Sequence, residues 1–440
     1  MVTHAQKNLS NEKIFAKGTD VEWDIVYDLA ESKVICCSNT IMTLHNLVYV
    51  TAFKSPKLHG RFIVLCSCAI LLVVLYSIKG TIYGLWEDVG LTSHTHFDEC
   101  PLLTLNSTVS YKYIVRPEER EFPLAFSLIV YTDADRVLRL FRAIYRPHNY
   151  YCIHIDRKSK PEFVNVTERL KQCPGVSHNV VLDADLTCAR ILLERAPGTW
   201  KYWINLTGQE FPLRTNWELV RALRLLNGSN IVQAVYRWRN VDRFPPKETL
   251  PENHCSELKG DIGSGSLHVA VRREFIDYAL NNPKGQQLYQ GIVSDETFFP
   301  TLNHNPAVFP IPGAFTGIHE EDVAIALARA KVWIQSRKPC GSGRWQRWIC
   351  MYGLADLPFL LSQPHFFANK FLPNVEPLAY DLLELWLAAK VLNETIHNRL
   401  ADSFNSTFYR LSPYATQHLE VCVHCTSNKS NLSSIVKDFI

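Results

Sequence analysis

No G-x-G-x-x-G turn follows the first apolar run of this sequence, which argues against a dinucleotide-dependent oxidoreductase. The charges are also nearly balanced, with 46 Lys and Arg against 43 Asp and Glu. No basic stripe carries interleaved aromatic residues, so nucleic-acid binding is not indicated. The chain does have 47% apolar residues over 440 positions, enough for a sizeable core in one large or two ordinary domains.

Residues 122–158 show a strand–helix–strand pattern. An apolar run from Phe126 to Tyr131 precedes a helical stretch, and a second run from Tyr150 to Ile155 ends at Asp156. This pattern is typical of the right-handed βαβ unit of an open parallel sheet. Such sheets bind ligands beyond the carboxyl ends of their strands, where an acid commonly holds a ribose hydroxyl. Asp156 has that position, although an ordinary turn residue also fits there.

A run without charges at 62–78 is bracketed by Arg61 and Lys79. It is at the short end for a transmembrane helix, and no convincing small-residue cleavage site follows it. Basic residues precede the run and acidic residues follow it, so the positive-inside rule places residues 1–61 in the cytosol. We therefore predict a type II signal-anchor at 62–78, a luminal stem at 79–100, a catalytic domain at 101–400 and a tail at 401–440. A buried helix of a soluble domain is the alternative for 62–78.

Sequons and cysteines after this run favour a luminal body. Eight N-x-S/T sequons follow it, of which Asn205 stands in an apolar run and is expected to be buried. The sequons predicted to carry glycans are Asn106, Asn165, Asn227, Asn393 and Asn405. Nine of the 13 cysteines also follow it, and most should be paired in an oxidising lumen. Cys422 and Cys425 have no second ligand pair at a spacing that suits zinc.

The rest of the chain alternates strand and helix patterns. We predict strands at 200–206, 230–236 and 267–271, and helices at 217–226, from 273, from 294, at 320–333 and at 355–361. The turn GQEFPL follows the first of these strands. A Gly-rich, basic and aromatic loop, CGSGRWQRWIC, runs from Cys340 to Cys350.

Taken in order, these motifs resemble the core 2/I-branching β-1,6-N-acetylglucosaminyltransferases. The resemblance runs from Asp98 to Leu400 through FPLAFSLIV, RAIYRPHNYYCIHID, KYWINLTGQEFPLRTN, GSGS before VRREF, SDE and FFANKF. It implies an α/β GT-A (Rossmann-like) glycosyltransferase domain with a mostly parallel central sheet, preceded by a single transmembrane helix in the Golgi membrane. It also implies inverting transfer of a sugar, GlcNAc from UDP-GlcNAc first of all, onto O-linked glycans of glycoproteins.

The resemblance assigns roles to residues that suit the chemistry. Glu296 matches the catalytic base that takes the proton of the acceptor hydroxyl. Arg347 and Lys370 match fixed cations that neutralise the leaving diphosphate, so neither a cofactor nor a divalent metal is expected. The implied donor contacts are Ile129, Val130, Tyr131, Asp156, Arg157 and Lys158, Trp333 matches an acceptor-side tryptophan, and the implied disulfides are Cys100–Cys173, Cys152–Cys188 and Cys340–Cys350.

Structural explanations stay open for some of these residues. Asp295 and Glu296 could simply favour a helix start, and Arg347 and Lys370 could be ordinary solvated bases. Two Asp-x-Asp sequences, at 133–135 and 183–185, would suit a metal-dependent transferase. The first lies at the predicted start of a helix and the second aligns with a helical stretch, which disfavours a metal role.

The sequence also departs from the family pattern. It lacks a donor-contacting segment between Val180 and Asp185, residues 237–263 do not reproduce the charged acceptor contacts, and the segment after Trp333 is shortened. One family disulfide has no partner near 382–386. Two function classes therefore remain: an active transferase, with UDP-glucose or UDP-xylose as alternative donors, or an impaired relative that binds glycans or acts like a chaperone.

Overall fold

The structure is a computed structural model of the whole chain, and it describes residues 100, 109, 111, 113–179, 184–196, 198–235, 264–291, 295–317, 326–336 and 338–419. The expected membrane helix at 62–78, the stem before Cys100 and the sequon at Asn106 lie outside these residues. Within the described ranges, no helix is both long enough and apolar enough to span a bilayer.

A six-stranded sheet forms the centre of the fold, in the order β3-β2-β1-β4-β7-β6. The strands are β1 (Leu124–Val130), β2 (Tyr150–Ile155), β3 (Val176–Asn179), β4 (Tyr202–Thr207), β6 (Ile231–Val235) and β7 (Ser264–Arg272). The first four in this order are parallel, whereas β7 is antiparallel to both of its neighbours. The sheet is therefore mixed and mostly parallel, as expected for an α/β domain.

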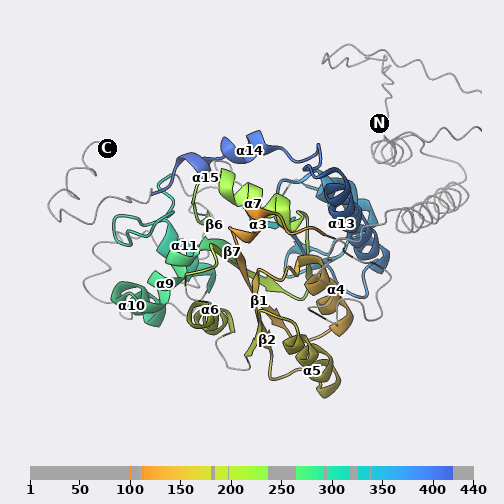
Figure 1. Cartoon of the computed structure of the whole chain (residues 1–440), viewed down its shortest axis with the longest axis horizontal. Helices are drawn as coiled ribbons and strands as arrows, with labels where there is room; N and C mark the ends of the chain where they lie inside the picture. Colours follow the sequence, from red (N-terminus) through yellow and green to blue (C-terminus); the bar gives the residue numbers. More distant parts are fainter. Residues whose placement is uncertain are drawn as a thin grey trace, which may run out of the picture. The chain divides into compact units, whose positions relative to one another are not determined.

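Helices cover both faces of this sheet (Figure 1). One face carries α4 (Ala134–Ile144), α5 (Pro161–Glu168) with the 3-10 turn η3 (Arg169–Gln172), and α7 (Asn216–Leu225), which packs on α3 (Pro117–Arg120). The other face carries α6 (Ala184–Arg195), α9 (Arg273–Asn281), α10 (Pro283–Gly291) and α11 (Asp295–Asn303). The resulting three layers are the usual way to bury both faces of a parallel sheet.

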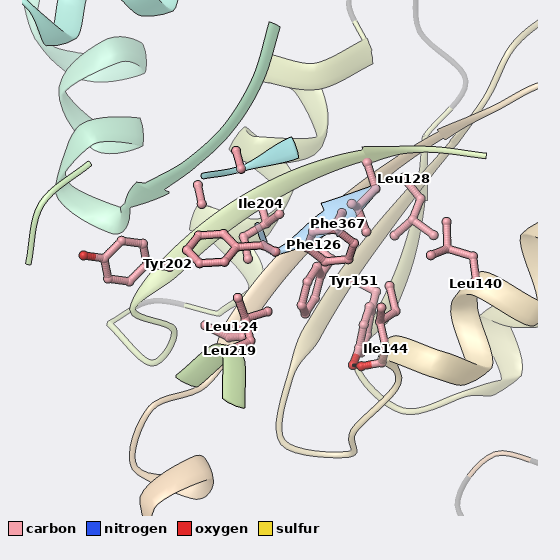
Figure 2. Close-up of a cluster of buried hydrophobic side chains, with 14 of the residues drawn as sticks. Leu124, Phe126, Leu128, Leu140, Ile144, Tyr151, Tyr202, Ile204, Leu219 and Phe367 are labelled. Carbon is pink, nitrogen blue, oxygen red and sulfur yellow. Dashed lines mark hydrogen bonds between the residues drawn. The ribbon is translucent and has the colours of Figure 1, made fainter. Parts of the chain in front are cut away.

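The side chains of β1 alternate between the two faces of the sheet and are apolar on both, which suits a strand in the centre of the sheet. Leu124, Phe126 and Leu128 belong to the core on the α4 side, whereas Ala125 belongs to the core on the α6 side. Figure 2 shows the first of these cores, with Phe126 beside Tyr151 of β2; their ring centroids are 5.5 Å apart. Fully burying one such side chain stabilises the fold by about 1.5–3 kcal/mol.

A smaller sheet stands beside the first. It consists of β5 (Glu210–Pro212), β11 (Phe367–Asn369) and β8 (Arg329–Ala330), in the order β5-β11-β8. The third core lies here, and it includes residues of the long helix α13 (Pro377–His397). Next to it lie the hairpin β9 (Trp345–Gln346) and β10 (Ile349–Cys350), η6 (Leu354–Asp356) and α12 (Leu357–Ser362).

The helix expected over 320–333 is wrong in its described part. Residues 326–333 contain strand β8, in which Arg329 pairs with Phe367 and Ala330 with Ala368. Alanine favours helices, but pairing with β11 and burial of Leu327, Ala328 and Ala330 outweigh that preference.

The structure also differs from the expected tail at its first residues. Helices α14 (Ser406–Arg410) and α15 (Pro413–Thr416) place Tyr409 and Tyr414 in the first core. Tyr409 stacks on Phe404 with a ring distance of 5.3 Å. Helices of four or five residues are too short to show a periodic pattern, so the sequence gives little sign of them.

All three expected cysteine pairs are disulfides in the structure, with Cα–Cα distances of 4.4 Å (Cys100–Cys173), 5.4 Å (Cys152–Cys188) and 5.6 Å (Cys340–Cys350). The second joins β2 to α6, so it fastens a helix to the face of the sheet. The third closes the loop that contains the β9–β10 hairpin.

Candidate active site

The carboxyl ends of β1 and β2 lie side by side. The backbone N–H of Asp156 donates to the carbonyl oxygen of Val130 over 2.9 Å, and Tyr131 just beyond is 53% exposed. Oδ1 of Asp156 accepts from the backbone N–H of Lys158 at 2.8 Å, which fixes the turn after β2. The expected donor contacts at the ends of these two strands therefore share one edge of the sheet; Ile129 is partly buried, and Arg157 and Lys158 are exposed.

The turn after β4 reaches the same edge. A Cβ on Gly208 would lie 3.2 Å from Val137 of α4 and 3.6 Å from Val130 of β1, so this turn packs tightly against both. The backbone N–H of Phe371 donates to the carbonyl oxygen of Gln209 at 2.8 Å. Lys370, immediately before Phe371, is thereby held beside the turn after β4.

Two cations come together at this point. The carbonyl oxygen of Lys370 accepts from the N–H of Tyr352 at 3.0 Å, which ties β11 to the chain that leaves the hairpin. The pKa of the half-buried Lys370 is lowered from its ordinary value, first by burial and then by the positive charge of Arg347. An anion bound near the two side chains would raise the pKa of Lys370 again, because it would favour the charged form.

The loop that carries Arg347 is held by Asp356. Its buried carboxylate accepts from the backbone N–H groups of Gly341 (2.6 Å), Ser342 (3.2 Å) and Gly353 (2.8 Å), beside the Cys340–Cys350 disulfide. In the described ranges, the one group of metal-ligand types close enough to hold an ion is Cys340, Cys350 and Asp356. Its sulfur atoms are bonded to each other and its carboxylate is used by the backbone, so this group does not fit a metal.

Glu296 is the second residue of α11 and is partly exposed. The backbone N–H of Glu296 donates to Oδ1 of Asp295 at 2.8 Å, so Asp295 serves the helix start. One turn later, Pro300 contacts β7: a Cβ on Gly265 would lie 3.0 Å from its ring and would collide with the carbonyl oxygen of Gln233. Only glycine allows this approach.

Adjacent residues of β7 connect the helix of Glu296 with the small sheet. Gly265 contacts α11, whereas Oγ of Ser266 accepts from Nζ of Lys331 at 2.9 Å. Lys331 directly follows β8, and β8 is parallel to β11, which leads into Lys370. The helix of Glu296 therefore packs on the beginning of β7, and the next residue of β7 contacts Lys331, whose strand β8 pairs with β11 before Lys370.

A fully buried carboxylate, Glu210, lies under this edge. It accepts from Nε of Arg329 (2.6 Å), Nδ2 of Asn369 (3.0 Å) and Oγ1 of Thr207 (3.0 Å). Burial by itself would raise the pKa of Glu210, but Arg329 and then His268 outweigh burial and lower it to about 2. One ionised carboxylate thus joins β4, β5, β8 and β11.

His268 extends this group towards Lys331. Its Nε2 lies 2.7 Å from Oε1 of Glu210, and its Nδ1 lies 2.9 Å from Nζ of Lys331. Burial, followed by the charge of Lys331, lowers the pKa of His268 to about 3, so the imidazole is neutral at pH 7. An ammonium group can only donate, which assigns the acceptor role to Nδ1 and the hydrogen to Nε2.

This group of Glu210, His268, Arg329 and Lys331 is not evident from the sequence. A charged residue inside the apolar turn GQEFPL and a histidine inside the apolar run of β7 were the available signs. The partners Arg329 and Lys331 are more than 100 residues further along the chain from Glu210, and the helix expected there hid the pairing of β8.

The Asp-x-Asp sequences have structural surroundings. Asp133 is the N-cap of α4 and accepts from the backbone N–H of Arg136, whereas Asp135 is exposed and 3.7 Å from Arg139. Asp183 lies outside the described residues, and buried Asp185 accepts from Nδ2 of Asn205 at 3.3 Å.

The other expected sites are distributed over the surface. Trp333 is partly buried and forms a β-bridge with Ile349 of the hairpin. Of the sequons, Asn165, Asn227 and Asn405 are exposed, Asn393 is partly buried, and Asn205 is buried as expected. The missing segment near Val180 and residues 237–263 fall in parts that the structure does not describe.

Comparisons with known proteins identify relatives of this chain. The sequence profile of the core-2/I-branching enzyme family matches residues 124–359. The chain is 34% identical to zebrafish (Danio rerio) β-1,3-galactosyl-O-glycosyl-glycoprotein β-1,6-N-acetylglucosaminyltransferase 4, over 64% of this chain and 74% of the relative. It is 32% identical to mouse (Mus musculus) N-acetyllactosaminide β-1,6-N-acetylglucosaminyl-transferase, over 81% of this chain and 95% of the relative.

A solved structure, mouse xyloside xylosyltransferase 1 in its apo form, matches 41% of this chain and 81% of its own. The TM-score is 0.25 and the sequence identity 14%.

Proposed function

The chain belongs to the core-2/I-branching enzyme family and is a glycosyltransferase of the β-1,6-N-acetylglucosaminyltransferase type, and from this we propose its reaction. The proposal is inverting transfer of GlcNAc from UDP-GlcNAc onto O-linked glycans of glycoproteins, forming a β-1,6 branch. The transfer takes place in a GT-A domain on the luminal side of the Golgi membrane, behind a type II anchor at 62–78, and needs no divalent metal.

The placement of Lys370 carries this proposal, because hydrogen bonds hold it beside the turn after β4 and the charge of Arg347 acts on it. Two cationic side chains at the carboxyl ends of the strands are suited to the diphosphate of a nucleotide sugar. As the glycosidic bond breaks, negative charge grows on the β-phosphate, and fixed cations stabilise it without reorganisation. The uridine and ribose then lie towards Asp156 and the ends of β1 and β2, near Ile129, Val130, Tyr131, Arg157 and Lys158.

Glu296 is the proposed base. In an inverting transfer it takes the proton of the acceptor hydroxyl while that oxygen attacks the anomeric carbon from the face opposite UDP. Its helix packs on the beginning of β7, the strand that also contacts Lys331. Trp333 is the proposed acceptor-side aromatic contact.

The decisive experiment measures transfer from UDP-GlcNAc to galactosyl-β-1,3-N-acetylgalactosamine by the full-length chain in EDTA. Glu296→Gln should lower kcat by about 10²–10⁴-fold while UDP binding is retained. Asp295→Asn is the matched control, since it changes the neighbouring acid that serves the helix start. Activity that disappears in EDTA and returns with Mn²⁺ would contradict the metal-independent mechanism.

The absence of the family segment between Val180 and Asp185 favours a second candidate, a relative that binds glycans without turnover. The same assay separates the two functions. Binding of UDP and disaccharide with no product from UDP-GlcNAc, UDP-glucose or UDP-xylose would support the second candidate. Product from UDP-glucose alone or from UDP-xylose alone would instead show that this nucleotide sugar, and not UDP-GlcNAc, is the donor.

A further inference from the structure

The tip of the β9–β10 hairpin presents two large aromatic side chains to solvent. Trp348 is 63% exposed and Trp345 is 37% exposed, and they stand on either side of Arg347 in the sequence. Tryptophan side chains are usually well buried, as Trp200 and Trp203 are in this fold. Two exposed indole side chains next to a proposed phosphate ligand are typical of a ligand-binding surface.

The backbone at this tip adopts a conformation that its residues do not favour. β9 ends at Gln346 and β10 begins at Ile349, so Arg347 and Trp348 are the two central residues of the hairpin turn. Both have positive φ, 50° for Arg347 and 66° for Trp348. Such turns normally contain Asn or Gly, because other side chains are strained there. Strained residues of this kind cluster where a protein needs particular side chains at a particular place.

The hairpin is held in place despite this strain. The Cys340–Cys350 disulfide closes it, and the N–H of Met351 donates to the carbonyl oxygen of Arg344 at 2.8 Å. The N–H of Ile334 donates to the carbonyl oxygen of Trp348 at 2.8 Å. The indole of Trp348 therefore extends from an anchored backbone, which keeps the entropy lost on binding a ligand small.

The position of the hairpin tip indicates that Trp348 contacts the acceptor rather than the donor. On one side, Arg347 acts on Lys370 and so belongs with the diphosphate. On the other side, Trp348 is bonded to Ile334, the neighbour of Trp333, and Ile349 forms a bridge with Trp333 itself. The backbone of Trp348 thus lies beside the segment that contains Trp333, the proposed acceptor-side tryptophan.

We infer that Trp348, assisted by Trp345, binds the acceptor glycan by stacking against the apolar C–H face of a pyranose ring. An indole face offers a large, rigid and uncharged contact, which suits a neutral sugar. The inference rests on the proposed function, because it extends the acceptor side of the same site. The occupant is a neutral saccharide of the acceptor, at least one ring beyond the hydroxyl that reacts.

Kinetics of the full-length chain test this role. With galactosyl-β-1,3-N-acetylgalactosamine as acceptor, Trp348→Ala should raise the acceptor KM about tenfold and leave the KM for UDP-GlcNAc within twofold. Trp345→Ala should have the same effect at about threefold, and Trp348→Phe should retain most of the affinity. Leu411→Ala, which removes a 71% exposed apolar side chain at the end of α14, is the control and should change neither constant.

Trp348→Gly separates binding from structure. Glycine relieves the strain of the positive φ, so the melting temperature should stay the same or rise by about 1–3 °C. The acceptor KM should nevertheless rise as in Trp348→Ala. A lower melting temperature in both variants with an unchanged acceptor KM would show that the indole serves the fold and would overturn the inference.

Direct binding decides the question even if transfer is not observed. Saturation-transfer NMR with the same disaccharide should show contact in the wild type and in Glu296→Gln, and weaker contact in Trp348→Ala. Equal signals in wild type and Trp348→Ala would overturn the acceptor role of Trp348, whatever the activity. Loss of UDP binding in Arg347→Ala and Lys370→Ala, measured separately, tests the proposed function and is independent of Trp348.

Discussion

The two sheets of this domain are held together in different ways. The six-stranded sheet is packed on both faces by apolar side chains, among them Phe126, Tyr151 and Trp203. The three-stranded sheet also has an apolar core, but its strands meet at the ionised Glu210 and its partners Arg329 and Asn369. The stability of the large sheet depends on the apolar area that its side chains bury and the volume that they fill. The stability of the small sheet also depends on individual hydrogen bonds and ion pairs at Glu210.

The apolar packing mainly stabilises the fold, whereas the buried ion pair mainly sets the positions of the strands. Apolar burial tolerates substitutions that keep the volume, whereas a buried ion pair fails as soon as one partner is removed. A buried pair adds little net stability over apolar residues of the same shape, but its partners must stand opposite each other, so we expect it to favour one strand register. In this protein that register is the one that brings β11, and hence Lys370, to the edge of the large sheet.

The largest effect is expected from Arg329→Met. This change leaves the carboxylate of Glu210 buried beside a neutral side chain, which should lower the free energy of unfolding by about 3–5 kcal/mol. Urea unfolding measures it. The double variant Glu210→Gln with Arg329→Met should recover most of the loss, and equal losses in single and double variants would contradict the role of the pair.

Phe126→Ala tests the apolar sheet. Removing this ring from between α4 and β2 should cost about 3–5 kcal/mol, because the transfer free energy is lost and a cavity remains. Phe126→Leu should cost clearly less, since it keeps most of the volume. In contrast to Arg329→Met, no second substitution at a single partner should restore the stability of Phe126→Ala.

Cys340→Ser with Cys350→Ser opens the loop around the hairpin. Loss of this short cross-link should reduce the free energy of unfolding by about 2–3 kcal/mol in the chain-entropy account. Because the hairpin carries Arg347, UDP binding measured by calorimetry should weaken as well. The pair Cys152→Ser with Cys188→Ser is the matched control, for it should lower stability and leave UDP affinity unchanged.

Lowering the pH should weaken the fold through its buried histidines. Burial, with the charges of Lys331 near His268 and of Lys338 near His365, lowers both pKa values from 6.5 to about 3. The unfolded chain binds these protons below pH 6.5 and the folded chain does not, so stability is full above pH 6.5 and falls towards pH 3.

Each of these histidines should contribute a slope of about 1 kcal/mol per pH unit between pH 6 and pH 4. Glu210 contributes to the slope only at the acidic end of that window, because its pKa is lowered from 4.5 to about 2 and its stabilisation is lost as the pH falls from about 5 towards 2. Stability curves of His268→Gln and His365→Gln against pH should be flatter than the wild-type curve. An unchanged slope would show that the imidazoles are already charged in the folded protein.

Local patterns predicted much of the large sheet. β2 has the expected bounds, Tyr150–Ile155, and β1, β4 and α7 differ from expectation by a few residues at their ends. These elements have long apolar runs or clear helical spacing, which survive any tertiary arrangement. The small sheet was not predicted, since β5, β8 and β11 are two or three residues long and have no period to detect.

The sequence by itself determined the α/β class, the family and the order of the motifs along the chain, because apolar periodicity and short motifs are local properties. Only the tertiary structure decided that Arg329 and His268 share the carboxylate of Glu210. It also decided that two tryptophans remain exposed on a strained turn. The contacts of Glu210 join residues that are far apart in the chain, and they depend on strand register and burial. Neither strand register nor burial can be read from a short stretch of sequence.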